Sequence, residues 1–171
     1  MLSKIVNIRT LVGIRRRLRE GGRTVVLTNG CFDVLHVGHV RYLYQARALG
    51  DCLIVGLNSD ASVRRLKGKK RPLVPEGERA EVLSALSCVD YVIVFDEPTA
   101  EKLVAKLKPD VYTKGGDYAL DEKEGHESWE RKLPEAKAVA AYGGEIQILP
   151  FMTGRSTTDL IQTVLERYGT K

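Results

Sequence analysis

The sequence predicts an α/β protein with a Rossmann-like, doubly wound, five-stranded parallel sheet in a single domain over residues 1–171. Short apolar runs typical of buried strands alternate with helical patterns of ten or more residues. This alternation indicates a parallel sheet with helices on both faces. The 171 residues are enough for one domain with a sizeable core, and neither an internal repeat nor a linker divides them.

The composition is that of a soluble globular protein, with 43% hydrophobic and 29% charged residues. No apolar run approaches the roughly 20 residues that span a bilayer, so we expect no membrane partner. Three scattered cysteines without a Cys-x-x-Cys pair exclude a disulfide framework and a zinc site of that type. This cysteine usage fits a cytoplasmic location.

The first half of the chain is expected to run helix, strand, helix, strand. Residues 1–22 hold an amphipathic N-terminal helix that ends at a pair of glycines. Its Arg-rich composition resembles a transit peptide, but its apolar stripe favours a structural helix. The first buried strand covers residues 24–28, a helical pattern follows His39, and the second strand covers residues 52–57.

The second half continues the same alternation. Residues 61–75 carry a basic cluster and two prolines, and we expect mostly loop there. Residues 118–134, which are polar, are expected to form a mobile loop or lid. Helices are expected over 76–86 (Val82, Leu83 and Leu86 inward), 99–107, 133–142 and 156–168 (Leu160, Ile161, Val164 and Leu165 inward), and strands over 91–95, 111–113 and 145–150.

Polar or glycine-rich segments follow the strands at their carboxyl ends. They cover residues 29–39, 58–70, 114–117 and 151–158. In an open parallel sheet, ligands bind outside the carboxyl ends of the strands, where the strand order reverses. We therefore expect these four segments to form one site.

His36 and His39 lie in a His-x-Gly-His motif between the end of the first strand and the first turn of a helix. Unpaired N–H groups and the helix dipole favour anions at such a position. The i, i+3 spacing projects both imidazoles from one side, and Gly38 leaves room for a ligand to approach. A Lys/Arg loop and a second helix N-terminus at Ser156 complete a predicted phosphate site.

Alternatives to this phosphate site have less support in the sequence. Neither a Walker A sequence nor a Gly-x-Gly-x-x-Gly motif follows the first strand. The net charge of +5 and two basic clusters, at residues 15–19 and 64–71, leave a nucleic-acid-binding module as a non-enzyme alternative. That alternative does not explain the paired histidines, and 6% aromatic residues provide little stacking surface, so we expect no nucleic-acid partner.

Residues 29–39 (Asn-Gly-Cys-Phe-Asp-Val-Leu-His-Val-Gly-His) resemble the signature of the His-x-Gly-His nucleotidyltransferase superfamily, which includes the cytidylyltransferases. A longer series of motifs resembles the stand-alone heptose 1-phosphate adenylyltransferases, which form ADP-heptose. The alternative enzyme is a glycerol-3-phosphate-type cytidylyltransferase that uses CTP. The series comprises Thr-Asn-Gly at 28–30, Asn-Ser-Asp-Ala-Ser at 58–62, Arg-Leu-Lys-Gly at 65–68, Arg-Pro at 71–72, Lys-Gly-Gly-Asp-Tyr at 114–118 and Ser-Thr-Thr at 156–158.

The resemblance implies ATP and a sugar phosphate as substrates, Mg²⁺ held mainly through the nucleotide phosphates, and a homodimer. It implies catalytic roles for His36, His39 and Lys67. The implied nucleotide-binding residues are Asn29, Gly30, Cys31, Phe32, His36, Gly38, His39, Lys67, Lys69, Arg155, Ser156 and Thr157. The implied substrate-binding residues are Asp33, Arg79, Lys114, Gly116 and Asp117.

Overall fold

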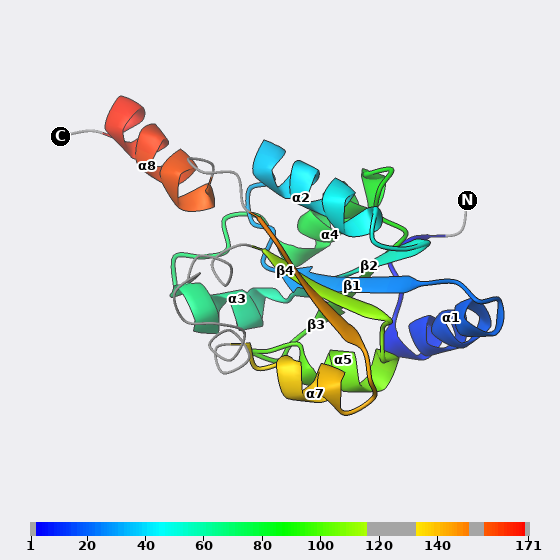
Figure 1. Ribbon diagram of the computed structural model, residues 1–171. Coiled ribbons are helices and arrows are strands. Elements are labelled where there is room, and N and C mark those ends of the chain that lie inside the picture. The colour runs from blue at the N-terminus through cyan, green and yellow to red at the C-terminus, as the bar shows by residue number, and fades with distance from the viewer. Residues whose placement is uncertain (1–2, 116–132, 151–155, 170–171) are drawn as a thin grey trace, which may run out of the picture.

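The computed structural model describes residues 3–115, 133–150 and 156–169. Its five strands form one sheet in which every neighbouring pair is parallel, in the order β3-β2-β1-β4-β5 (Figure 1). The predicted Rossmann-like, five-stranded parallel sheet is therefore confirmed. The strands are β1 (Val25–Gly30), β2 (Cys52–Asn58), β3 (Tyr91–Phe95), β4 (Val111–Gly115) and β5 (Glu145–Leu149).

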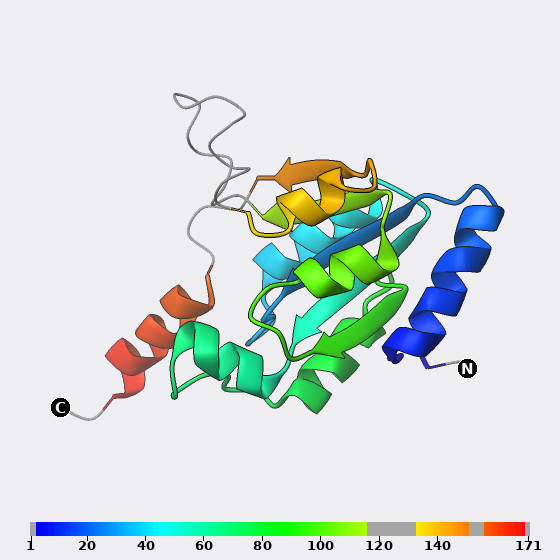
Figure 2. The ribbon, with the colours of Figure 1, turned by 90° about the horizontal axis from the view of Figure 1, so that it is seen from below.

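Helices cover both faces of the sheet (Figures 1 and 2). One apolar cluster joins α1, α5 and α7 to the sheet face that carries Val25 and Leu27, and a second joins α2 and α4 to the face that carries Val26. The described helices are α1 (Ile8–Glu20), α2 (Val37–Arg47), α3 (Asp60–Lys67), α4 (Glu76–Ala85), α5 (Glu101–Leu107), α7 (Ala136–Ala140) and α8 (Thr157–Tyr168).

The expected loop over residues 61–75 is wrong in its first half, which forms α3. The Ser59 side chain caps this helix by accepting a hydrogen bond from the Ser62 amide at 3.1 Å. Asp60 lies in the first turn, where it favours the helix dipole, and Val63 is fully buried. The cap and this buried contact stabilise a helix that the cluster of basic residues concealed.

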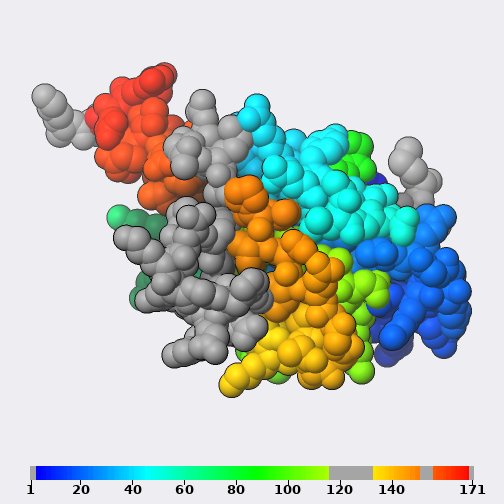
Figure 3. All heavy atoms as spheres, viewed as in Figure 1, coloured from blue at the N-terminus to red at the C-terminus, as the bar shows by residue number. Residues whose placement is uncertain are grey.

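The predicted inward face of α8 is also wrong, whereas that of α4 is confirmed at Leu83, which is 1% exposed, and wrong at Val82. Val82 of α4 is exposed, and α8 contains no buried residue, with Val164 and Leu165 both more than half exposed. Both ribbon views show α8 extending away from the sheet, and in the space-filling view it projects from one side of the molecule (Figures 1, 2 and 3). The hydrophobic periodicity correctly predicted an apolar stripe on α8. It could not predict whether that stripe packs against the sheet.

None of the described helices has both the length and the apolar character needed to cross a bilayer. Residues 118–132 of the expected lid lie outside the part of the chain that the structure describes.

Candidate active site

The strand order reverses between β1 and β4, which are hydrogen-bonded neighbours in the middle of the sheet. β1 ends at Gly30 and continues directly into the His-x-Gly-His segment, whereas β4 ends at Gly115. This is the position at which open α/β sheets bind ligands. The topology therefore brings the histidine motif and the end of β4 to one edge.

His36 is the N-cap of α2. Its Nδ1 accepts a hydrogen bond from the Gly38 amide at 3.1 Å. An imidazole whose Nδ1 accepts carries its proton on Nε2, so Nε2 is the donor of this ring. The ring of His39 stacks on that of His36, with centroids 3.9 Å apart and planes inclined by 30°. The two rings thus form a compact donor pair at the N-terminus of α2.

His39 is a neutral imidazole at physiological pH. Burial lowers its pKa to about 4, and the neighbouring His36 contributes to the same direction of shift. Its Nδ1 is buried and has no hydrogen-bond partner among the described residues. A neutral ring can still donate one N–H, so His39 can polarise a phosphate oxygen without bringing a full charge into the site.

The turn between β1 and α2 has an unusual backbone. Phe32 and Val34 both have positive φ, at 43° and 54°, a conformation that is uncommon for residues other than glycine and that is enriched at functional sites. The Phe32 ring is 6% exposed and lies 5.4 Å from the ring of His39. A Cβ on Gly30 would lie 3.1 Å from the Phe32 ring. Gly30 therefore leaves room for the Phe32 ring, which packs in a tilted arrangement against the ring of His39.

Asn29 connects β1 to β4 at this edge. Its Oδ1 accepts hydrogen bonds from the Tyr112 hydroxyl at 2.6 Å and from Lys114 Nζ at 2.9 Å. Burial lowers the pKa of Lys114, an effect that nearby Glu135 partly opposes. The hydrogen bond to the Asn29 side chain thus positions the Lys114 ammonium next to the histidine loop.

Basic residues from four segments converge on Cys31. Burial raises the pKa of this thiol, and the charges of Lys67, Arg79, Lys114 and Arg71 oppose that rise. Lys67 is the last residue of α3 and is exposed, as is Lys69 beyond Gly68. The charge of Lys67 therefore acts on Cys31 in the histidine loop, and it adds to the positive potential of this edge.

Asp33, a predicted substrate-binding residue, is buried, and protein groups bind its side chain. Its carboxylate accepts hydrogen bonds from the Leu73 and Val74 amides at 2.9 to 3.0 Å and from Arg71. Burial alone would raise the pKa of Asp33, but these hydrogen bonds outweigh it and hold the pKa below its ordinary value. The geometry favours a positioning role, in which Asp33 holds the loop after α3 against the histidine turn.

Arg79 is likewise engaged within the protein. It is 2% exposed, and each of its three guanidinium nitrogens has a protein partner. Nε donates to the Val74 carbonyl, Nη1 donates to the carbonyls of Cys31 and Asn58, and Nη2 pairs with Asp60 at 2.7 Å. Direct contact of Arg79 with a substrate has no support in this geometry.

The N-terminus of α8 also reaches the histidine turn. Ser156 and Asp159 form a capping box, and the Thr157 hydroxyl donates to the Asp33 carbonyl at 2.7 Å. The predicted second helix N-terminus is thus brought to the same edge. Arg155, Gly116 and Asp117 lie outside the described residues.

Two features of the site were missed by sequence reasoning. Tyr112 lies in the predicted strand over residues 111–113, and its hydroxyl donates a hydrogen bond to Asn29 Oδ1. Glu135 is 2% exposed; one carboxylate oxygen accepts from the Ala100 amide at 2.7 Å, and the other has no partner among the described residues. No sequence signal distinguishes either residue from an ordinary strand tyrosine or a surface glutamate.

The match to a known family covers most of the chain. A family model described as cytidylyltransferase-like matches residues 27–163, a range that includes both histidines, Lys67 and Ser156. The chain belongs to the cytidylyltransferase-like family. The predicted nucleotidyltransferase is thereby confirmed at the level of the family.

Curated relatives of this cytidylyltransferase-like chain include proteins named Bifunctional protein HldE. The protein from Geobacter sulfurreducens is 51% identical over 167 residues, which are 98% of this chain and 32% of the relative. The one from Wolinella succinogenes is 47% identical over 162 residues, which are 95% of this chain and 31% of the relative. The chain thus spans less than two thirds of the length of these relatives.

Two solved structures have a similar fold. One is a lipopolysaccharide core biosynthesis protein from Thermoplasma volcanium, 33% identical with a TM-score of 0.57, and the match covers 77% of this chain and 98% of that one. The other is the pantoate-beta-alanine ligase of Francisella tularensis, 16% identical with a TM-score of 0.59, covering 90% of this chain and 68% of that one. The second likeness concerns the fold alone.

Proposed function

We propose that this chain transfers AMP from ATP to a heptose 1-phosphate, giving ADP-heptose and pyrophosphate. The observation that carries the proposal is the stacked histidine pair at the N-terminus of α2, in which His39 is neutral, at the reversal point of the sheet. The motif series named above and the relatives called HldE support the heptose assignment. The name of the Thermoplasma volcanium protein, in lipopolysaccharide core biosynthesis, points the same way.

In the proposed reaction, a phosphate oxygen of the sugar phosphate attacks the α-phosphorus of ATP in line. The bond from the α-phosphorus to the bridging oxygen breaks, and pyrophosphate leaves with its electron pair. The attacking oxygen is already ionised at neutral pH, so no general base is needed. Catalysis then consists of positioning and of stabilising the charge that develops on the α-phosphate.

The proposed roles follow from where the side chains lie. His36, through Nε2, and His39 donate to the α-phosphate, while Lys67, with Lys69, neutralises the β- and γ-phosphates. Ser156 and Thr157 contribute from the N-terminus of α8, where the Thr157 amide lies in the first turn and the Ser156 amide donates to Asp159 within the capping box. The remaining nucleotide contacts are proposed for Asn29, Gly30, Cys31, Phe32, Gly38 and Arg155.

Lys114, which is hydrogen-bonded to Asn29, is proposed to bind the sugar phosphate together with Gly116 and Asp117. Asp33 and Arg79 act there as positioning residues, because protein groups already occupy them. Mg²⁺ enters with the nucleotide. We propose that the ion is held mainly by the phosphate oxygens of the nucleotide, since Mg²⁺ is commonly bound through substrate phosphates. Within the described residues no group of three or more His, Cys, Asp or Glu side chains could hold a metal.

A second candidate is a cytidylyltransferase that uses CTP and glycerol 3-phosphate, and the description of the matching family favours it. Both are tested by a pyrophosphate-release assay that crosses ATP and CTP with heptose 1-phosphate and glycerol 3-phosphate. We expect release with ATP and heptose 1-phosphate, and a His39→Ala variant as the inactive control. Release confined to CTP and glycerol 3-phosphate would overturn the first candidate in favour of the second.

We also propose that the enzyme acts as a homodimer in the cytoplasm. Sedimentation equilibrium of the purified chain tests the dimer, and a mass equal to one chain at micromolar concentration would contradict it.

A further inference from the structure

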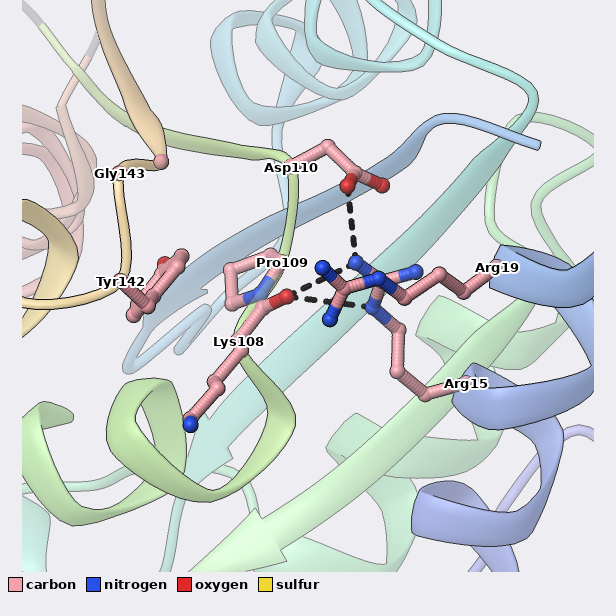
Figure 4. A pocket seen from close by; sticks show the side chains of 8 residues that line it. Arg15, Arg19, Lys108, Pro109, Asp110, Tyr142 and Gly143 are labelled. Atoms are coloured by element: carbon pink, nitrogen blue, oxygen red, sulfur yellow. Dashed lines mark hydrogen bonds and ion pairs between the residues drawn. The ribbon is translucent and has the colours of Figure 1, made fainter. Parts of the chain in front are cut away.

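Figure 4 shows a pocket of about 360 Å³. It lies at the amino edge of the sheet, because Asp110 directly precedes β4 and Gly144 directly precedes β5. It is lined by the last turns of α1, by Lys108, Pro109 and Asp110 before β4, and by the turn before β5. β1 runs between this edge and the catalytic edge, and its six residues separate them by roughly 20 Å. None of the residues proposed for nucleotidyl transfer lines the pocket.

Arg15 supplies an unused donor in the wall of this pocket. The residue is 6% exposed, and its Nη2 pairs with Asp110 at 2.8 Å and donates to the Lys108 carbonyl at 2.9 Å. Its Nη1 is buried and has no hydrogen-bond partner in the described part of the chain. Buried guanidinium nitrogens almost always donate a hydrogen bond, so we expect Nη1 of Arg15 to donate to an acceptor outside the described residues.

Tyr142 supplies a second unused donor, on the other side of Pro109 in Figure 4. Its hydroxyl is buried and unpartnered among the described residues. Burial raises the pKa of Tyr142 to about 12, so the hydroxyl keeps its proton and remains a donor. A Cβ on Gly144 would lie 2.5 Å from the ring, so the glycine turn is what admits the tyrosine here.

The charge at the pocket is positive. Arg19 and Lys108 are exposed, and neither forms an ion pair with a described residue. Both oxygens of Asp110 are already used, one by Arg15 and the other by the Val25 amide at 2.7 Å. Arg19 lies in the last turn of α1, where a positive charge stabilises the helix dipole, and this alone could explain Arg19. It does not explain why two buried donors in the same pocket lack acceptors.

We propose that this pocket binds the phosphate group of a small phosphorylated molecule at a site separate from the catalytic edge. The phosphate oxygens accept from Arg15 Nη1 and the Tyr142 hydroxyl, and Arg19 and Lys108 balance the charge. The volume is within the range of small-molecule sites. This inference does not depend on the reaction proposed above.

The test is an amide NMR titration of the full chain with inorganic phosphate, pyrophosphate and ATP in separate arms, at constant ionic strength set with chloride. Shifts of the Gly143 and Gly144 amides report this pocket, and shifts of the Gly38 amide report the catalytic edge. We expect saturable shifts of Gly143 and Gly144 with at least one of the three probes. The probe that binds most tightly identifies whether free phosphate, a diphosphate or a nucleotide is the source of the phosphate group.

Matched variants decide whether binding is specific. An Arg19→Ala, Lys108→Ala double variant should weaken the response at Gly143 and Gly144 at least tenfold, and Tyr142→Phe should weaken it several-fold. Arg16→Ala removes another exposed cation of α1 that does not line the pocket, and it should change the response at Gly143 and Gly144 less than twofold. The proposal is overturned if no probe gives saturable shifts there, or if Arg16→Ala weakens binding as much as the double variant.

Discussion

At the scale of single residues, the site depends on the protonation of two imidazoles stacked 3.9 Å apart. Two positive rings at this distance would repel each other, and burial makes His39 the ring that stays neutral. A neutral donor stabilises developing negative charge without attracting the substrate equally strongly in the ground state. This matches the requirement that catalysis favour the transition state over the substrate.

We expect His39→Ala to lose at least about a hundredfold in turnover, because removing one preorganised donor to a developing oxyanion costs on the order of 3 kcal/mol. Steady-state pyrophosphate release measures the loss, and the urea midpoint verifies that the variant folds. Gln45→Ala, an exposed position on the same helix, is the matched control and should stay within about twofold. Turnover close to that of the control in a folded His39→Ala chain would remove His39 from the catalytic set.

The His39 imidazole should not titrate between pH 8 and 5, because its pKa lies near 4 in the folded protein. The unfolded chain takes up this proton near pH 6.5, so it binds more protons than the folded one between about pH 6.5 and 4. Stability should therefore fall as the pH decreases through that window. Imidazole NMR resonances measured against pH test this directly, and a His39 midpoint near 6.5 would contradict it.

At the scale of elements, the loop after α3 is held to the histidine turn by one carboxylate, that of Asp33. Asp33→Ala would leave the Leu73 and Val74 amides without their acceptor and Arg71 without its ion-pair partner. We expect a loss of about 3 kcal/mol in the free energy of unfolding. Faster hydrogen exchange at Leu73 and Val74 should accompany it.

The control for Asp33→Ala is Asp96→Ala, at an exposed position, which should change stability by less than about 0.5 kcal/mol. The lowered pKa of Asp33 means that its stabilisation is complete above about pH 4 and is lost only as the pH falls through its lower folded-state value. Equal exchange rates at Leu73 and Val74 in Asp33→Ala and the unsubstituted chain would contradict the proposed role of the carboxylate.

Element types were mostly predictable because hydrophobic periodicity reports which residues share a face. Periodicity does not report what covers that face, and α8 shows the difference: its stripe at Leu160, Val164 and Leu165 was identified but is exposed. α3 was missed because its basic composition resembled a loop. Its Ser59 cap and buried Val63 were present in the sequence and, weighed together, could have identified the helix.

At the scale of the whole molecule, the parallel sheet explains why the histidine motif and Lys114 could be assigned to one site from sequence. Strands that run the same way place all their carboxyl ends at one edge. The sequence could not show which polar residues the protein would use internally. Asp33 and Arg79 are chemically suited to a substrate, but partners distant in sequence, at Arg71 and Asp60, engage them.

The opposite edge of the sheet is organised by Asp110, which joins α1 to the first residues of β1 and β4. One of its oxygens pairs with buried Arg15 at 2.8 Å and the other accepts from the Val25 amide at 2.7 Å. Asp110→Ala would leave Arg15 buried without its carboxylate and Val25 without its acceptor. We expect a loss of about 2 to 3 kcal/mol in the free energy of unfolding, measured by urea denaturation, because the Asp110 side chain is 40% exposed and water screens part of the interaction.

Turnover of the Asp110→Ala variant should stay within about twofold at temperatures well below its midpoint, since the length of β1 separates this edge from the histidines, roughly 20 Å away. Arg16→Ala, whose 4.0 Å pair with Glu20 is highly exposed, is the matched control and should cost less than about 0.5 kcal/mol. A similar cost in both variants would show that Asp110 does not join the elements of this edge. A large fall in turnover without loss of folded protein would show instead that the two edges are coupled.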